Sequence, residues 1–245
     1  MPENNILFRK NPWSDTDVEQ HWDNVSTIYI SENKKVDRAH NQRFTETVKY
    51  LNLYSNAKVL NISSRDCEAI SFILKENNTV NIINAEISSG LIAEAKKIHS
   101  DASQIKIDSY SHIPFKEEEF DRIVCLETLE HVENPVDFLR ELYRVSTKEA
   151  RMVLSCPPLT SEIPYKIFTF LFGGHGEGPH RFLRSNEVKQ LLKHTGWSLL
   201  LHKGTLLIPA GPFFLQRFGD WLIDKFQKTF ISELGIRQFY VCEKK

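Results

Sequence analysis

Two short apolar runs, separated by an amphipathic stretch, form the clearest hydrophobic pattern in the chain. Residues 123–126 (Ile-Val-Cys-Leu) are apolar between charged segments, as in a strand that is buried on both faces. Apolar residues recur at helical spacing over 136–143, and a second apolar run at 152–154 ends before two prolines. Strand, helix and strand at this length predict a parallel crossover unit, whose first loop opens at the carboxyl edge of a sheet.

The same criteria predict the other elements of an α/β domain. The further predicted strands are residues 58–62, 79–85, 105–108, 198–202 and 238–243, and the further predicted helices are 38–51, 68–74, 91–98 and 187–194. An earlier helix is indicated by apolar residues at three- and four-residue steps: Trp13, Val18, Trp22 and Val25. Because no linker, repeat or low-complexity tract interrupts the pattern, a single domain over residues 1–245 is predicted.

Composition narrows the class of protein. Apolar residues make up 41% and charged residues 26% of the chain, as is ordinary for a soluble domain. The formal net charge of −1 argues against a dedicated nucleic-acid surface, so no nucleic-acid partner is expected. The four cysteines form no CxxC pair, which favours reduced, buried thiols and a cytoplasmic location. We find neither a signal-peptide pattern nor a run of about 20 apolar residues that could span a membrane.

Residues 120–145 (FDRIVCLETLEHVENPVDFLRELYRV) and 151–158 (RMVLSCPP) carry a family resemblance. They resemble the central motifs of class I S-adenosylmethionine-dependent methyltransferases, in the small-molecule group often called type 11. The resemblance extends from about Val59 to Trp197. It implies an α/β, Rossmann-like fold with a seven-stranded, mostly parallel sheet, an antiparallel strand 7 and helices on both faces. It also implies S-adenosyl-L-methionine as the cofactor.

The glycine-rich turn of this family is degenerate here. Where the family has V-L-D-x-G-x-G-x-G, residues 59–67 read VLNISSRDC, so that Asn61 replaces the acidic residue and Ser63, Arg65 and Cys67 replace the glycines. A Cβ at each of these positions narrows the cleft and disfavours a positive φ. Two outcomes stay open. Ser63 and Ser64 donate hydrogen bonds to the cofactor while Arg65 pairs with its carboxylate, or the Arg65 side chain fills the pocket.

The resemblance implies further cofactor contacts at the ends of the next strands. Glu86 would accept hydrogen bonds from both ribose hydroxyls, with Ile87 beside it, and Glu86→Ala is expected to weaken cofactor binding without unfolding the protein. Asp108 would reach the adenine amine through a shifted loop, or Ser109 would do so more weakly. Glu127, after the strand at 120–126, completes the expected cofactor site.

The sequence offers three candidates for a general base. Methyl transfer is a direct displacement that depends on alignment, and an oxygen or nitrogen acceptor can also need a proton acceptor. His131 follows the central strand, while His175 and His180 belong to the glycine-rich stretch before the helix at 187–194. Structural or solvated roles compete with catalysis at each of them. No metal site is predicted, because the cysteines and histidines lack the spacing of metal ligands.

Three segments lie outside the central motifs. For two of them the sequence allows two interpretations, and the role of the third is implied by the family resemblance. Residues 1–50 form an N-terminal helical lid over the cofactor or pack on the edge of the sheet. Residues 159–185 correspond to the insertion that builds the acceptor side. Near the C-terminus one helical face is strongly apolar: Phe214, Phe218, Trp221, Leu222 and Phe226. We expect this face to pack on the core, and the alternative is peripheral contact with a lipid surface or a hydrophobic acceptor.

The sequence therefore predicts S-adenosylmethionine-dependent methyl transfer to a small-molecule or lipid-linked acceptor. The alternative is a catalytically inactive, methyltransferase-like binding module that has lost cofactor binding, and the glycine replacements motivate it. Cofactor binding distinguishes the two. The sequence specifies neither the acceptor nor the oligomeric state.

Overall fold

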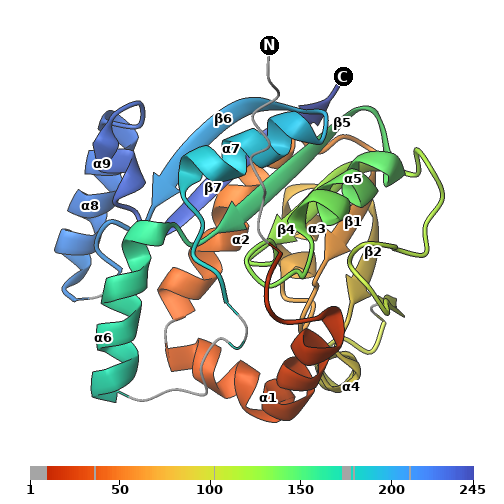
Figure 1. Ribbon diagram of the computed structural model, residues 1–245, viewed down its shortest axis with the longest axis horizontal. Helices are drawn as coiled ribbons and strands as arrows, with labels where there is room; N and C mark the ends of the chain where they lie inside the picture. The colour runs from red at the N-terminus through yellow and green to blue at the C-terminus, as the bar shows by residue number, and fades with distance from the viewer. Residues whose placement is uncertain (1–9, 36, 102, 173–177, 179, 210) are drawn as a thin grey trace.

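A seven-stranded sheet forms the centre of the molecule (Figure 1). The computed structural model describes residues 10–35, 37–101, 103–172, 178, 180–209 and 211–245. The strand order is β3-β2-β1-β4-β5-β7-β6, and β7 pairs antiparallel with both of its neighbours while β1 to β5 pair in parallel. The strands are β1 (Lys58–Ile62), β2 (Asn81–Glu86), β3 (Gln104–Lys106), β4 (Phe120–Leu126), β5 (Ser146–Cys156), β6 (Trp197–Thr205) and β7 (Arg237–Lys244). The predicted sheet, with its antiparallel strand 7, is confirmed.

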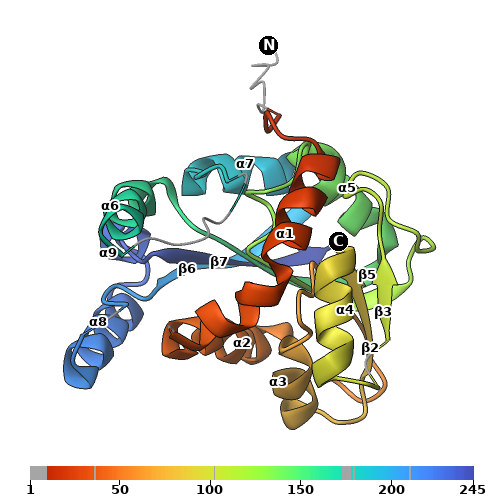
Figure 2. The same ribbon diagram turned by 90° about the horizontal axis from the view of Figure 1, so that it is seen from below.

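Helices cover both faces of this sheet, as predicted. The helices are α1 (Asp15–Lys35), α2 (Asp37–Leu51), α3 (Ala69–Glu76), α4 (Ser89–Ile98), α5 (Pro135–Val145), α6 (Glu162–Phe172), α7 (Ser185–His194), α8 (Phe213–Lys225) and α9 (Phe230–Glu233), with a 3-10 turn η1 (Leu159–Ser161). Figure 2 shows α5 and α7 on one side of the sheet and α2 and α3 on the other. Alternate residues of each strand face the two sides, so Leu60 joins the core cluster that includes α5 while Val59 joins the cluster under α2 and α3.

The central crossover unit forms as its sequence predicts. The Asn134 side chain accepts a hydrogen bond from the Asp137 backbone N–H, and Pro135 begins α5. Phe138 and Leu142 of α5 are buried against β4 and β5. The strand predicted from the apolar run at 152–154 is longer than that run, because the chain becomes extended directly at Ser146 and pairs there with Phe120.

The expectation that the C-terminal aromatic face packs on the core is also wrong. Gly219 and Ile223 are the buried residues of α8, whereas Phe214, Phe218 and Trp221 are exposed. The helix is turned this way because Gly219 lies close to Ile208, with the position of an added Cβ only 3.1 Å from Ile208 atoms. None of the described helices is long and apolar enough to cross a membrane.

A prediction about folding concerns Gly204 in β6, whose backbone lies against α9. A Cβ at this position would lie 1.7 Å from the Ser232 carbonyl oxygen, and the Gly204 N–H donates to the Ser232 hydroxyl at 2.7 Å. Gly204→Ala should therefore lower the free energy of unfolding by about 3 kcal/mol, because backbone must move on both sides. Urea denaturation measures this change, with Ser198→Ala in the same strand as the control. Equal stability of Gly204→Ala and the wild type would contradict the close packing of α9 on β6.

Candidate functional site

The predicted site residues lie at the carboxyl edge of the sheet, where β1, β2 and β4 end. The turn at residues 63–68 follows β1, Glu86 ends β2 and Glu127 follows β4. Helix α1 lies across this edge, and α2 continues from it onto one face of the sheet (Figure 2). Trp22 of α1 contacts Arg65 there. The sequence-based placement of the site at this edge agrees with the general position of ligand sites in open parallel sheets.

The turn after β1 keeps a glycine-like backbone without its glycines. Ser63, Arg65 and Cys67 have φ angles of 53°, 52° and 65°, all in the left-handed region. This conformation costs roughly 1–2 kcal/mol for each residue that carries a Cβ. The Cβ atoms disfavour positive φ, as expected, but they do not prevent it, because the surrounding structure maintains the conformation.

Glu86 connects this turn with β2 through the backbone of Arg65. Its carboxylate accepts hydrogen bonds from the backbone N–H groups of Arg65 at 2.8 Å, Ile87 at 2.9 Å and Ser88 at 3.0 Å. The Ser64 N–H adds a bond to the Ala85 carbonyl oxygen at 3.0 Å. Glu86 is fully buried, so a charged acceptor binds three buried donors that would otherwise lack a partner here. The carboxylate predicted to bind ribose hydroxyls thus ties the turn to β2.

The Arg65 side chain fills the space between the turn and α1. Its guanidinium carbon lies 3.8 Å from the centre of the Trp22 ring, and Nη1 lies 3.6 Å from Glu86 Oε1. The Ser63 hydroxyl donates to the Tyr110 hydroxyl at 3.1 Å, and Arg65, Trp22 and Tyr110 are all buried. Of the two outcomes that the sequence left open, this arrangement corresponds to the filled pocket. The residues present do not fit S-adenosyl-L-methionine in this conformation, because Arg65 occupies the place beside Glu86.

The remaining predicted adenine contacts do not converge on Glu86. The Asp108 side chain is 99% exposed and faces Lys106, whose Nζ lies 3.5 Å from Oδ1. The Ser109 hydroxyl donates to Asp15 Oδ2 at 2.7 Å, so this residue holds the start of α1. Asn61 is also occupied, since its side-chain amide donates to Asn84 Oδ1 at 2.9 Å between β1 and β2.

A second polar cluster surrounds Glu127. Its Oε1 accepts from the Ser155 hydroxyl at 2.6 Å and from Arg237 Nε at 3.2 Å. Arg237 also donates to the Ala39 carbonyl oxygen at 2.9 Å, which connects β7 with α2. Glu127 itself has a φ of 49°, so its backbone is also in the left-handed region. Sequence reasoning missed Arg237, because it lies far from the other motifs and has no local signal.

Buried ionisable groups between α2 and the turn extend this cluster. Arg43 Nη2 lies 3.0 Å from His40 Nε2, and His40 is hydrogen-bonded to Glu68. Burial, together with the Arg43 charge, lowers the pKa of His40. Burial and the neighbouring Glu68 carboxylate raise the pKa of Asp66 to about 6. Asp66 is therefore a carboxyl group that titrates near neutral pH within the candidate site.

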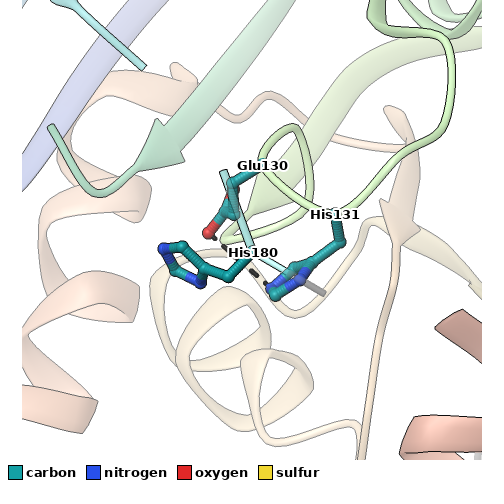
Figure 3. Close-up of side chains that lie close together, drawn as sticks. All are labelled: Glu130, His131 and His180. Carbon is teal, nitrogen blue, oxygen red and sulfur yellow. Dashed lines mark ion pairs between the residues drawn. The ribbon is translucent and has the colours of Figure 1, made fainter. Parts of the chain in front are cut away.

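Figure 3 shows three further groups that meet at the site, Glu130, His131 and His180. The His131 ring contacts Trp22. The potential ligand atoms of the three groups all lie within 4.8 Å of one another, and Glu130 Oε1 is 3.9 Å from His131 Nε2. Two imidazoles and a carboxylate form a donor set of the kind that zinc accepts, which the spacing along the sequence did not reveal. The same groups can exchange a proton. His175 lies outside the described residues.

The Trp22 ring connects the two halves of the site. Its centre lies 5.5 Å from that of His131, and the His131 ring lies 5.3 Å from that of His180. The centre of the His180 ring lies 4.3 Å from that of Phe182. The same ring stacks on Tyr165 of α6, with 6.0 Å between the two ring centres. One side chain of α1 therefore contacts both Arg65 and His131. The sequence indicated Trp22 as part of an apolar stripe but not its position in the site.

A family model and a known protein both relate part of this chain to methyltransferases. Residues 67–154 match the family model of a methyltransferase domain, and the match begins at the last residue of the degenerate turn. The mitochondrial ubiquinone biosynthesis O-methyltransferase of Schizosaccharomyces pombe is 25% identical over 195 residues, which cover 74% of this chain and 67% of that protein.

Solved structures share the fold at low sequence identity. The [4+2]-cyclase SpnF has a TM-score of 0.69 at 13% identity, covering 96% of this chain and 98% of that chain. The methyltransferase in a complex with the Haloferax volcanii Trm112 methyltransferase activator has a TM-score of 0.68 at 12% identity, covering 91% and 96%. A SAM-dependent methyltransferase from Aquifex aeolicus has a TM-score of 0.58 at 15% identity, covering 87% and 96%. At these identities the similarity establishes the fold alone.

The contacts of Glu86 lead to a prediction that differs from the one made from the sequence. Glu86→Ala removes the acceptor of three buried N–H groups, so we expect the free energy of unfolding to fall by about 3 kcal/mol or more. Urea denaturation followed by circular dichroism measures the loss. Glu76→Ala, which removes an exposed carboxylate at the end of α3, is the control and should change stability by less than about 0.5 kcal/mol. Equal stability of Glu86→Ala and Glu76→Ala would show that Glu86 does not hold the turn.

The raised pKa of Asp66 predicts a pH dependence. Because its pKa of about 6 in the folded protein exceeds the ordinary value of 3.8, the uncharged carboxyl group favours folding. That contribution is complete below the ordinary value and is lost as the pH rises through 6. Ionisation should therefore cost up to about 3 kcal/mol of stability.

Asp66→Asn should remove this loss. The stability of the variant relative to the wild type should increase between about pH 4.5 and pH 7.5, as measured by urea denaturation at each pH. The titration of His40 is common to both proteins and cancels in the difference to first order. A stability difference that stays constant over this range would contradict the assignment.

Proposed function

Since residues 67–154 form a domain of the class I S-adenosylmethionine-dependent methyltransferase family, whose cofactor is S-adenosyl-L-methionine, we propose that this protein transfers a methyl group to a small-molecule or lipid-linked acceptor. The observation that carries the proposal is the backbone of the turn after β1. Ser63, Arg65 and Cys67 keep positive φ angles at a cost of roughly 1–2 kcal/mol each. Strain of this size at three alternate positions is typical of a functional site, because the surrounding structure must maintain it.

The closed arrangement leaves the cofactor no room, so the proposed activity requires a second arrangement of α1. Arg65 is held by the Trp22 ring and by Glu86. When Trp22 moves with α1, Arg65 loses one of these two contacts and can leave the space beside Glu86. The described part of the predicted lid, α1 and α2, then acts as a cover of the crevice. In the open arrangement we propose that Ser63, Ser64, Glu86 and Ile87 line the cofactor crevice.

The same movement uncovers the candidate bases. The Trp22 ring contacts His131, and the His131 ring contacts His180. We propose that His180 lies on the side of the acceptor. We propose that one of these imidazoles takes the proton of the acceptor, while Tyr165 and Phe182, in the described part of residues 159–185, line the acceptor site. The curated relative from fission yeast is named for O-methylation in ubiquinone biosynthesis, which supports an oxygen of a hydrophobic molecule as the acceptor atom. A cytoplasmic location remains proposed, supported by four buried free cysteines.

A second candidate function rests on Arg65 itself. A guanidinium that contacts both an indole ring and a carboxylate in a buried site is well stabilised, and it occupies the crevice. If this arrangement persists in solution, the protein is a methyltransferase-like binding module without turnover. The two candidates differ in whether the crevice can open.

Calorimetric titration with S-adenosylhomocysteine separates the two functions. We expect weak binding by the wild type and binding that is tighter by at least about tenfold in Arg65→Gly, because the variant has no cation–π contact to break. Glu149→Gly is the matched control. Glu149 is exposed and also has a positive φ of 64°, so the control gains the same backbone freedom away from the site.

The absence of binding would favour the second candidate function. If Arg65→Gly is folded and binds no S-adenosylhomocysteine at millimolar concentration, the crevice does not hold the cofactor and the second candidate function stands. If binding occurs, turnover is measured with methyl-labelled cofactor and a cell extract, and label in the organic phase indicates a lipid-linked or hydrophobic acceptor. Label confined to the aqueous phase indicates a small polar acceptor.

A further inference from the structure

Helix α8 has two opposite faces, and its aromatic face is the one turned to solvent. Gly219 and Ile223 lie on the buried face. Phe214, Phe218 and Trp221 recur at four- and three-residue steps and are 69%, 51% and 49% exposed. At 100° per residue, these three positions lie on the side of the helix opposite to Gly219 and Ile223. Aromatic side chains of this size are rarely left together in water on a soluble domain.

The exposed aromatic surface continues beyond α8. We define the aromatic face as Phe213, Phe214, Phe218, Trp221 and Phe230. Phe230 begins α9 and is 74% exposed, and the exposed Ile163 and Ile167 lie on α6. Figures 1 and 2 both show α6, α8 and α9 together at one end of the molecule. The Thr160 hydroxyl, just before α6, donates to the Glu233 carbonyl oxygen at 2.9 Å, which joins this end together.

The acidic and basic side chains over residues 213–228 lie in different surroundings. The two acidic residues of α8 are bound to the body of the protein: Asp220 pairs with Arg38 at 2.8 Å and Asp224 with Lys203 at 2.6 Å. The exposed cations Arg217, Lys225 and Lys228 have no carboxylate within ion-pair distance among the described residues. Lys225 Nζ lies 4.8 Å from the centre of the Trp221 ring, so cations border the aromatic face. The outward side of α8 is therefore aromatic and positively charged, although the whole chain carries a net charge of −1.

We propose that the aromatic face docks on an anionic lipid bilayer, with α8 lying in the plane of the headgroups. Aromatic side chains with bordering Lys and Arg are typical of interfacial helices that bind anionic membranes. With 13 residues, α8 lies on the surface and does not span a bilayer. A second copy of this chain fits less well, because a symmetric contact would bring the same three cations together from both copies.

This proposal does not require methyl transfer. Lipid docking is measured without any cofactor, so its failure is distinct from a failure of the proposed function. Docking would nevertheless bring α6, which follows the carboxyl end of β5, close to hydrophobic molecules dissolved in the membrane.

The test is cosedimentation of the full chain with lipid vesicles. One set of vesicles is pure phosphatidylcholine, and in the other about one third of the lipid is phosphatidylglycerol. We expect binding to the anionic vesicles that weakens as salt is added. Phe214→Ser/Trp221→Ser should weaken this binding by at least about tenfold, because two large apolar side chains no longer enter the interface. Arg217→Glu/Lys225→Glu/Lys228→Glu should remove the preference for anionic vesicles while the aromatic side chains remain.

Matched controls change the same properties elsewhere. Leu74→Ser/Ile98→Ser removes two exposed apolar side chains on α3 and α4, and Lys75→Glu/Lys96→Glu reverses two exposed cations there. Both should bind as the wild type does. Circular dichroism verifies that every variant is folded, and quenching of Trp221 fluorescence by brominated lipid, compared with Trp221→Phe, reports whether this ring enters the interface.

Three results would overturn the proposal. The wild type fails to bind either kind of vesicle, or the aromatic variant binds as tightly as the wild type. The third is a dimer in light scattering that Phe214→Ser/Trp221→Ser converts to a monomer, which would identify a second copy as the occupant of the aromatic face.

Discussion

The candidate site depends on one buried carboxylate. Glu86 accepts backbone hydrogen bonds from Ile87 and Ser88 after β2 and from Arg65 in the turn after β1, and thereby ties this turn to β2. The charge-assisted hydrogen bond from the Arg65 N–H helps to offset the strain of about 1–2 kcal/mol at that residue. The same carboxylate attracts the Arg65 guanidinium, so the group that shapes the crevice also draws in the side chain that fills it.

The state of the crevice is therefore decided by α1. Trp22 covers Arg65 on one side and His131 on the other, and Asp15 at the start of α1 is bound to Ser109 and to the Tyr110 N–H. These contacts connect the first helix with the ends of β1, β3 and β4. A movement of α1 would alter the cofactor side and the acceptor side together, which is a physical basis for coupling closure to binding.

The central unit was predictable because its signals are local. Asn134 caps α5 and Pro135 begins it, and apolar residues at helical spacing form its buried face. The runs 123–126 in β4 and 152–154 in β5 are apolar throughout. Glu86 was predictable as a carboxylate at the end of a strand, but its partners were not, because they depend on where the turn after β1 lies in space. The orientation of Arg65 depends on Trp22, which belongs to a different helix. The meeting of His131 with His180 likewise depends on a distant part of the chain, because the residues just before α7 lie against the loop after β4.

The sequence by itself determined the order of the elements, the parallel sheet and the edge at which the site lies, because periodicity and capping act over a few residues. Only the tertiary structure decided which face of α8 is buried. The periodicity indicated two faces, and the more apolar one was expected to turn inward. The close approach of Gly219 to Ile208 and the ion pairs of Asp220 and Asp224 with the body turn the aromatic face outward instead. Contacts between residues far apart in the sequence leave no local pattern, so only the tertiary structure reveals them.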